Sequence, residues 1–131
     1  MDGNLFLLTA GSLRCKTLER VLVEAGGYQF GVTSLSINEL QTVKLKDHVN
    51  YIILDFPNIH GSANKIISEI KSMQPKAFLI GIHFYQKIKL IQPLMDAGLD
   101  GYLLYNPTKT DVKKAMDIIE SGQKYIPSRL F

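Results

Sequence analysis

The sequence predicts an α/β domain: a doubly wound, five-stranded parallel sheet with helices on both faces, a (βα)5 three-layer sandwich. Short apolar runs alternate with longer segments in which apolar residues recur at helical spacing. The runs at residues 5–8 and 51–54 are continuously apolar, which is typical of strands buried on both faces. Strands separated by helices pair in parallel, because a crossover returns the chain to the same end of the sheet. The 131 residues fit one such domain, since two cores would each approach the lower size limit for folding alone.

The first half of the chain predicts strands at residues 5–8, 28–32 and 51–54, the last of which ends at Asp55. Ser12 suits a helix N-cap, and Gly26-Gly27 ends the helix that follows it. The apolar positions of this helix are Leu13, Leu18, Val21 and Leu22. Residues 36–46 predict a weaker helix, whose apolar contacts we expect from Leu35, Ile37, Leu40 and Leu45.

The second half predicts strands at residues 77–82 and 102–104, each followed by a helix. Pro75 ends the helix before the first of these strands, Gly98 and Gly122 end the later helices, and Thr108 suits an N-cap. Pro93 falls inside a helix and could kink it. The apolar helix positions are Ile66, Ile67, Ile70, Met73, Ile88, Ile91, Leu94, Met95, Val112, Ala115, Met116 and Ile119. We expect residues 1–124 to form the domain, and residues 125–131 to be a tail or the start of a linker to an output domain.

Composition and charge exclude several classes of protein. Fifteen Lys and Arg against twelve Asp and Glu give a net charge of +3, but the basic residues are spread along the chain, which favours a solvated surface over a nucleic-acid site. No apolar run approaches the ~20 residues of a membrane span. Cys15 is the single cysteine and reads as a small buried residue of the first helix. With no disulfide and no signal peptide, we expect a cytoplasmic protein.

Ligands of open parallel sheets bind beyond the carboxyl ends of the strands. The residues at those ends are Thr9, Ala10, Asp55, His83 and Tyr105. The loop after the first strand has too few glycines for a phosphate or dinucleotide site. A nucleophile elbow, a Cys-x-x-Cys motif and a cluster of metal-ligand residues are also absent from the sequence, so we expect no metal, no cofactor and no enzyme activity.

Two motifs resemble the receiver domain of two-component response regulators, which has the CheY-like, flavodoxin-like fold. Residues 97–104 (AGLDGYLL), with the helix end at residues 120–123 (ESGQ), are similar to receivers that precede a LuxR-type helix-turn-helix output domain. Residues 51–55 (YIILD) resemble the strand that carries the phosphoacceptor aspartate of the phosphorelay. The resemblance covers nearly the whole chain. It implies that Asp55 holds the phosphoacceptor position and Tyr102 the position of the switch aromatic.

The same resemblance implies that the phosphorylation chemistry is degenerate. Thr9 and Ala10 stand where these receivers carry an acidic pair for magnesium, and one carboxylate alone binds that ion poorly. His83 replaces a Ser or Thr, and Tyr105 replaces a Lys. We therefore expect Asp55 to cap its loop through backbone N–H groups, and His83 to be solvent-facing or hydrogen-bonded. Tyr105 should fill the space of the missing ion and lysine, and the aromatic residues 83–85 form either a plug or an interaction surface.

The resemblance and these departures from it imply an atypical receiver, a phosphorylation-independent signalling or dimerisation module of a transcriptional regulator. The resemblance implies the contact surface, because such receivers usually pair through the fourth helix, fifth strand and fifth helix. A protein or a second copy would bind there, and DNA would be contacted only through an output domain. The surface residues of that face are Lys87, Lys89, Asp111, Lys113, Lys114 and Asp117, and an aspartate at 111 or 117 would meet a partner's lysine. Two alternatives stay open: a working phosphoacceptor at Asp55, or a sensor of a small ligand near His83 and Tyr105.

Overall fold

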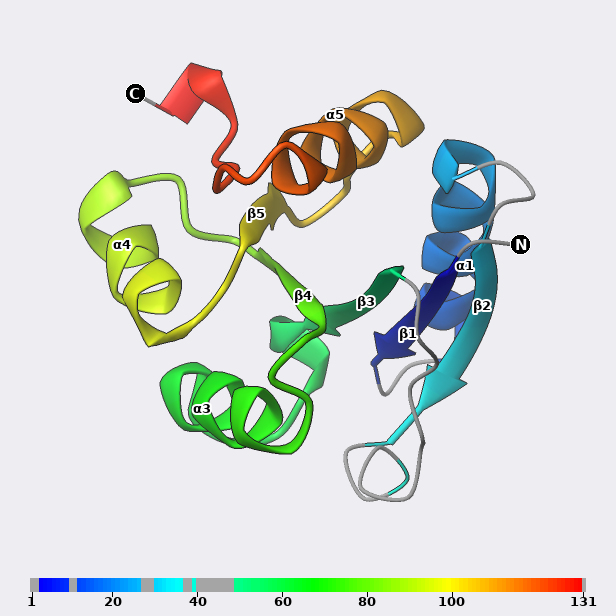
Figure 1. Cartoon of the computed structure of the whole chain (residues 1–131), viewed down its shortest axis with the longest axis horizontal. Helices are drawn as coiled ribbons and strands as arrows, with labels where there is room; N and C mark the ends of the chain where they lie inside the picture. Colours follow the sequence, from blue (N-terminus) through cyan, green and yellow to red (C-terminus); the bar gives the residue numbers. More distant parts are fainter. Residues whose placement is uncertain (1–2, 10–11, 27–29, 37–38, 40–48, 131) are drawn as a thin grey trace.

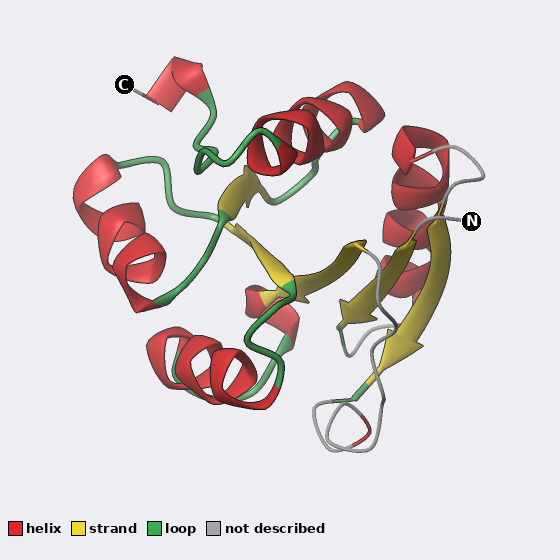
Figure 2. Cartoon of the chain, in the orientation of Figure 1, coloured by secondary structure: helices red, strands yellow, loops and turns green. Residues whose placement is uncertain are grey.

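The structure, a computed structural model, describes residues 3–9, 12–26, 30–36, 39 and 49–130. Five parallel strands form one sheet in the order β2-β1-β3-β4-β5, with helices on both faces (Figure 1) (Figure 2). This is the doubly wound α/β sandwich that the sequence predicts. The elements are β1 (Gly3–Leu8), α1 (Ser12–Gly26), β2 (Phe30–Leu35), β3 (Val49–Asp55), η2 (Phe56–Asn58), α3 (Ala63–Met73), β4 (Phe78–His83), α4 (Ile88–Ala97), β5 (Gly101–Leu104), α5 (Lys109–Glu120) and η3 (Ser128–Leu130).

Successive residues of the central strands face opposite helix layers. In β1, Leu5 and Leu7 pack in a buried cluster with residues of α1 and α5, whereas Phe6 and Leu8 pack in a second cluster with residues of α3 and α4. The same alternation holds in β3. Both faces of the sheet are therefore dry, which explains the continuously apolar strands of the sequence.

The second strand lies further along the chain than predicted. β2 runs from Phe30 to Leu35, because its residues pair in register with all of β1, from Gly3 to Leu8. The strand thus extends to Leu35, beyond the end expected at residue 32. The helix expected at residues 36–46, and with it the expected contact of Leu35, lies outside the described residues except for Ser36 and Glu39. The Ser36 N–H donates to Glu39 Oε1 at 3.1 Å, and the Glu39 N–H donates to Ser36 Oγ at 3.2 Å.

The remaining helices lie close to their predicted places. α4 continues through Pro93, which is on the exposed side, where water can replace the hydrogen bond that proline cannot donate. α5 begins with a capping box: Thr108 Oγ1 accepts from the Asp111 N–H, and the Asp111 carboxylate accepts from the Thr108 N–H, each at 3.1 Å. Among the helices that the structure describes, none is long and apolar enough to cross a bilayer.

Gly81, in the middle of β4, lets two side chains approach the sheet closely. A Cβ at this position would lie 2.5 Å from Phe56 Cε2 and 2.7 Å from Leu99 Cδ1, which is closer than real contacts allow. Phe56 is the first residue of η2, the turn that directly follows Asp55. The position of this turn therefore depends on the absence of a side chain at Gly81.

Candidate functional site

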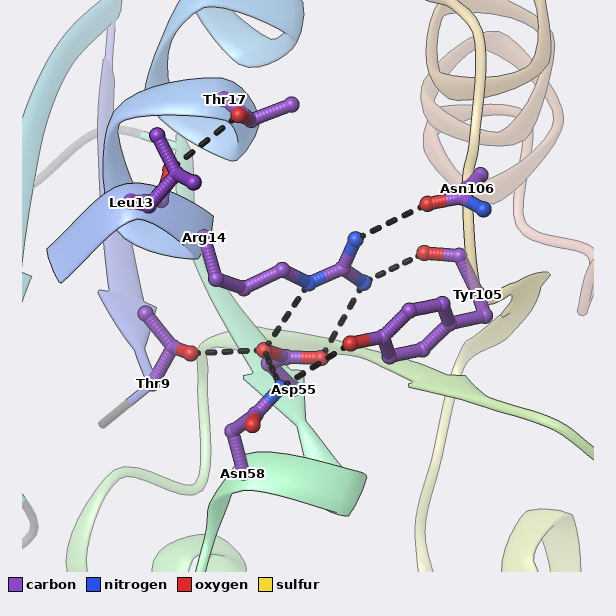
Figure 3. Close-up of polar contacts among 8 residues, drawn as sticks. All are labelled: Thr9, Leu13, Arg14, Thr17, Asp55, Asn58, Tyr105 and Asn106. Atoms are coloured by element: carbon purple, nitrogen blue, oxygen red, sulfur yellow. Dashed lines mark hydrogen bonds and ion pairs between the residues drawn. The ribbon is translucent and has the colours of Figure 1, made fainter. Parts of the chain in front are cut away.

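Asp55 ends β3 at the carboxyl edge of the sheet and is fully buried, with 0% exposure. Its Oδ2 accepts hydrogen bonds from Thr9 Oγ1 at 2.6 Å and from Asn58 Nδ2 at 2.8 Å (Figure 3). Arg14 adds a two-pronged contact, Nε to Oδ2 at 3.2 Å and Nη2 to Oδ1 at 3.3 Å. Both carboxylate oxygens thus accept hydrogen bonds from the Arg14 guanidinium, which offsets the cost of burying this group.

Arg14 reaches this carboxylate from the first turn of α1 and is itself only 11% exposed. Its guanidinium lies over the ring of Tyr105, 3.7 Å from the centroid, and its Nη1 donates to Asn106 Oδ1 at 3.2 Å. Nη2 also donates to the backbone carbonyl of Tyr105. A single cation therefore joins the start of α1, the end of β3 and the loop after β5.

The expected backbone cap at Asp55 is wrong. Asp55 stands at the N-cap position of η2, yet its side chain makes no capping hydrogen bond there. The physical reason is Arg14, because a bidentate guanidinium bonds a carboxylate more strongly than a neutral N–H group does. The carboxylate is turned toward the side chains of Thr9, Arg14 and Asn58 instead.

Thr9 and Tyr105 both lie at the carboxyl edge near Asp55, whereas Ala10 lies outside the described residues. The Tyr105 ring stacks against Phe84 at a centroid distance of 4.3 Å and has the Arg14 guanidinium over it. Its hydroxyl accepts a long hydrogen bond, 3.5 Å, from Asn58 Nδ2. The tyrosine ring thus lies beside the ion pair as a wall of the site.

His83 lies beside the site and turns toward other aromatic rings. It stacks on Tyr85 at 4.1 Å and on Phe56 at 5.9 Å, between ring centroids. Its Nδ1 accepts from the Phe84 N–H at 2.8 Å, so the neutral ring carries its proton on Nε2. Burial lowers the pKa of His83, and the negative charge of Asp55 opposes that shift only in part.

Tyr102 is fully buried, and its hydroxyl donates to the Tyr85 carbonyl at 2.7 Å. Burial raises the pKa of Tyr102 well above its usual range. Of the three aromatic residues at 83–85, His83 and Tyr85 are half-buried, whereas Phe84 stays 56% exposed. The loop after β4 therefore contributes both packing and one exposed apolar ring.

The residues predicted for the partner face do not all remain available. Lys87, Lys89 and Lys114 are exposed, and Lys113 pairs with Asp117 within α5 at 3.9 Å. The Asp111 carboxylate is occupied by its own chain: it belongs to the capping box and lies 3.7 Å from Arg129 Nη1. Asp117 is therefore the better of the two acidic candidates for a contact with a partner's lysine.

Cys15 is half-buried, not buried as expected, because it lies beside polar side chains of α1 and β2. Its thiol donates to Glu19 Oε1 at 2.9 Å and lies 3.0 Å from Ser34 Oγ. Burial, and then the hydrogen bond to Glu19, raise the pKa of the thiol. The sulfur is therefore protonated at neutral pH and a poor nucleophile.

The site does not fit the magnesium ion that receivers of this kind use. Within the described residues, no group of three or more His, Cys, Asp or Glu side chains could hold a metal. At the carboxyl edge, Asp55 has the Arg14 guanidinium against both oxygens, where a divalent cation would be repelled. The residues present supply an internal cation and a threonine hydroxyl where an ion would need carboxylates.

Sequence reasoning missed Arg14, Asn58 and Asn106. Arg14 is an isolated basic residue in the first turn of a helix, a pattern usually typical of solvated surface. One clue was available: position 14 follows the end of β1 by a few residues, so its long side chain starts at the same edge as Asp55. Asn58 carried a similar clue, since it lies one turn after Asp55.

Comparison with known proteins identifies the fold but not a close relative. No protein-family model matches the chain, and no curated protein matches it. The isolated REC domain of RcsB from Salmonella enterica serovar Typhimurium, with phosphomimetic BeF3-, is similar with a TM-score of 0.75 and 20% identity, over 100% of this chain and 99% of that chain. A two-component response regulator of the LuxR family from Aurantimonas sp. SI85-9A1 is similar with a TM-score of 0.73 and 12% identity. That match covers 97% of this chain and 91% of the other chain.

A longer RcsB response regulator from Salmonella typhimurium, studied for its interaction with DNA, is similar with a TM-score of 0.74 and 21% identity. The match covers 99% of this chain but only 66% of that one. The protein therefore has the receiver fold of two-component response regulators, as the sequence motifs predicted. The chain matches the isolated REC domain over nearly its whole length and the longer regulator over 66% of its length.

Proposed function

We propose that this chain is an atypical receiver domain, which signals as a dimerisation or partner-binding module of a transcriptional regulator without aspartyl phosphorylation. One observation carries the proposal: the phosphoacceptor position, Asp55, is buried and ion-paired to Arg14. The receiver fold of the structural neighbours supports the wider class, and the LuxR-family members among them support a link to transcription.

The ion pair opposes phosphoryl transfer in two ways. Transfer needs a carboxylate oxygen in line with the phosphodonor and a cation that neutralises the developing charge. Both oxygens of Asp55 already accept hydrogen bonds, and Thr9 lies where the acidic pair would hold the cation. Arg14 compensates the charge of Asp55 from within the chain, so this edge of the sheet needs no bound cation to balance the buried carboxylate.

The exposed charges support the proposed partner face. Lys87, Lys89 and Lys114 are exposed around α4 and α5, and Asp117 is exposed on α5. A surface that carries both signs suits symmetric pairing, in which Asp117 of one copy meets a lysine of the other. Sedimentation at tens of micromolar across a salt series tests this pairing: dimer that weakens with salt is expected, and monomer throughout would contradict it.

The lack of phosphorylation is tested with BeF3- and magnesium. Backbone amide spectra of the wild-type chain should stay unchanged during the titration, because Asp55 presents no free oxygen. Asp55→Asn is the matched control, since it keeps the shape of the side chain and cannot be phosphorylated. A saturable spectral change that Asp55→Asn abolishes would overturn the proposal in favour of a working phosphoacceptor.

A second candidate function, sensing of a small ligand, is favoured by one cavity. A cavity of about 420 Å³ lies between the start of α3 and α4, lined by Phe56, His83 and Tyr85 among others. Tyr105, which the sequence placed at such a pocket, does not line it. Titration with small aromatic acids would show saturable amide shifts around His83 and Tyr85 if this candidate is right, and none if it is wrong.

A further inference from the structure

Residues 124–130 lie between α4 and α5, along the edge of β5 that β4 leaves free (Figure 1). Tyr125 forms a parallel bridge with Gly101. Its N–H donates to the Asp100 carbonyl, and its own carbonyl accepts from the Tyr102 N–H, both at 2.9 Å. The segment thus continues the sheet by hydrogen bonds of the kind that join neighbouring strands.

Basic side chains hold the segment at both ends. Lys124 Nζ donates to the carbonyls of Leu99 at 2.7 Å and Met95 at 3.4 Å, where α4 ends. The Met95 carbonyl lies in the last turn of α4, where it also accepts from the Gly98 N–H, and Leu99 follows the helix end. A lysine at this end is stabilising, because it meets the negative end of the helix dipole. At the other end, Arg129 lies 3.7 Å from Asp111 in the first turn of α5. The segment therefore spans from the end of α4 to the start of α5.

Apolar side chains join the segment to both buried clusters. Tyr125 is 5% exposed and belongs to the cluster that includes α5, whereas Ile126 and Leu130 pack against the cluster that includes α3 and α4. Pro127 is buried, and its lack of a backbone donor suits an outer edge where no further strand pairs. Residues 125–130 thus pack as part of the domain, beyond the boundary expected at residue 124.

We propose that residues 124–130 fill the outer edge of β5 as an intramolecular strap, and that a second copy of this chain pairs through the α4–β5–α5 face only when the strap leaves. The inference rests on the partner face of the proposed function. The strap occupies both the backbone edge of β5 and the Asp111 carboxylate. If only molecules with an open strap can pair, the apparent dissociation constant equals the intrinsic one divided by the fraction of open molecules.

The closed strap is tested by hydrogen exchange of two amides in the wild-type chain. The Tyr102 N–H donates only across to the strap residue Tyr125, and the Tyr125 N–H donates back to Asp100. Both amides should be protected, because strand hydrogen bonds slow exchange. Exchange of both amides at the rate of an open chain would overturn the inference while leaving the proposed function untouched.

Release is tested with Tyr125→Pro, which removes the N–H donor and the buried ring together. We expect faster exchange at Tyr102 and an apparent dimer dissociation constant lowered by at least ~10-fold in sedimentation.

If this variant fails to fold, Arg129→Asp serves instead, since it places like charges beside Asp111. Arg20→Asp, the same charge change at an exposed position of α1, is its matched control. We expect Arg129→Asp to tighten association by about 2–5-fold and the control to leave it unchanged.

The other outcomes separate the two proposals. The wild type and the release variant could form equally tight dimers while the Tyr102 amide is protected in the wild type. That result would show that the strap does not oppose pairing, and it would overturn this inference alone. A release variant with an unprotected Tyr102 amide that stays monomeric at every concentration would overturn both the gating by the strap and the dimerisation part of the proposed function.

Discussion

Two aspartate ion pairs of nearly equal length lie at opposite edges of the sheet. At the carboxyl edge, Arg14 Nε lies 3.2 Å from Asp55; at the amino edge, Lys71 Nζ lies 3.3 Å from Asp100. The side chains of the first pair are 11% and 0% exposed, and those of the second are 29% and 22% exposed. The two pairs therefore differ in their exposure to water, and also in the cation, since Arg14 contacts both oxygens of Asp55 and Lys71 contacts one oxygen of Asp100.

The partners of the two carboxylates differ in the same sense. Asp100 Oδ2 also accepts from the Leu79 N–H at 2.8 Å, and Lys71 also donates to the Ala77 carbonyl, so this pair joins backbone segments that meet at the start of β4 and β5. Within the described part of the chain, the donors to Asp55 are side chains, from the residue after β1, from α1 and from η2. The amino-edge pair fastens a turn, whereas the carboxyl-edge pair neutralises a buried charge where receivers place their chemistry.

Removal of the buried cation should have the largest effect. Arg14→Ala leaves the Asp55 carboxylate buried without its cation, and we expect the free energy of unfolding to fall by about 3–5 kcal/mol. Denaturant unfolding measures this change, with Arg20→Ala, at an exposed position of the same helix, as the control. A loss below about 1 kcal/mol would show that water reaches Asp55 and that the two pairs do not differ as described.

Neutralisation of the carboxylate should cost less than removal of the cation. In Asp55→Asn the amide keeps some of the hydrogen bonds, and the long Arg14 side chain can turn its charge toward water. We expect a loss of about 1–3 kcal/mol in the same unfolding experiment. A loss larger than that of Arg14→Ala would reverse the assignment of Asp55 as the more poorly solvated partner.

The amino-edge pair should contribute less than either change at the carboxyl edge. Lys71→Ala removes a partly exposed cation, and Asp100 keeps both water and the Leu79 N–H as partners. We expect a loss of about 1 kcal/mol or less. A loss equal to that of Arg14→Ala would mean that burial does not distinguish the two pairs.

The smallest effect concerns pH and the histidine near the buried pair. Burial lowers the pKa of His83 below its ordinary value of 6.5. The unfolded chain therefore binds a proton more readily than the folded one between these two pKa values, so stability falls as the pH drops through that window. His83→Gln should flatten the dependence of the unfolding midpoint on pH just below 6.5. An unchanged slope would assign the acid sensitivity to other groups.

The strands, and the edge of the sheet where the site lies, were predictable because continuously apolar segments indicate burial. In residues 51–54, the side chains on both faces of the strand are apolar. This pattern is typical of a strand that is covered by helices on both faces. The positions of Thr9 and Asp55 at one edge follow from parallel strands alone. Arg14 could not be assigned in this way, because its partner lies 41 residues away and its burial depends on the loop that carries Tyr105 and Asn106.

Other failures have the same origin in long-range packing. The local pattern ended the second strand at residue 32, whereas pairing with β1 extends β2 to Leu35. Asp55 before a turn favours a backbone cap locally, but a guanidinium from another element displaces that option. The bridge of Tyr125 to Gly101 could not be predicted locally either, because it depends on a strand edge that only the sheet order leaves open.

The absence of a side chain at Gly81 in β4 affects the hydrogen bonding of Asp55 at the carboxyl edge. Even one methyl group there would push against the ring of Phe56, which shares the short turn η2 with Asn58. Asn58 supplies Asp55 with its 2.8 Å amide contact and also reaches the Tyr105 hydroxyl. A purely steric change on an apolar strand would thus be transmitted as a lost hydrogen bond to a buried anion. The tolerance of this fold to mutation at Gly81 is therefore set by the electrostatics of Asp55 as much as by the packing around Phe56.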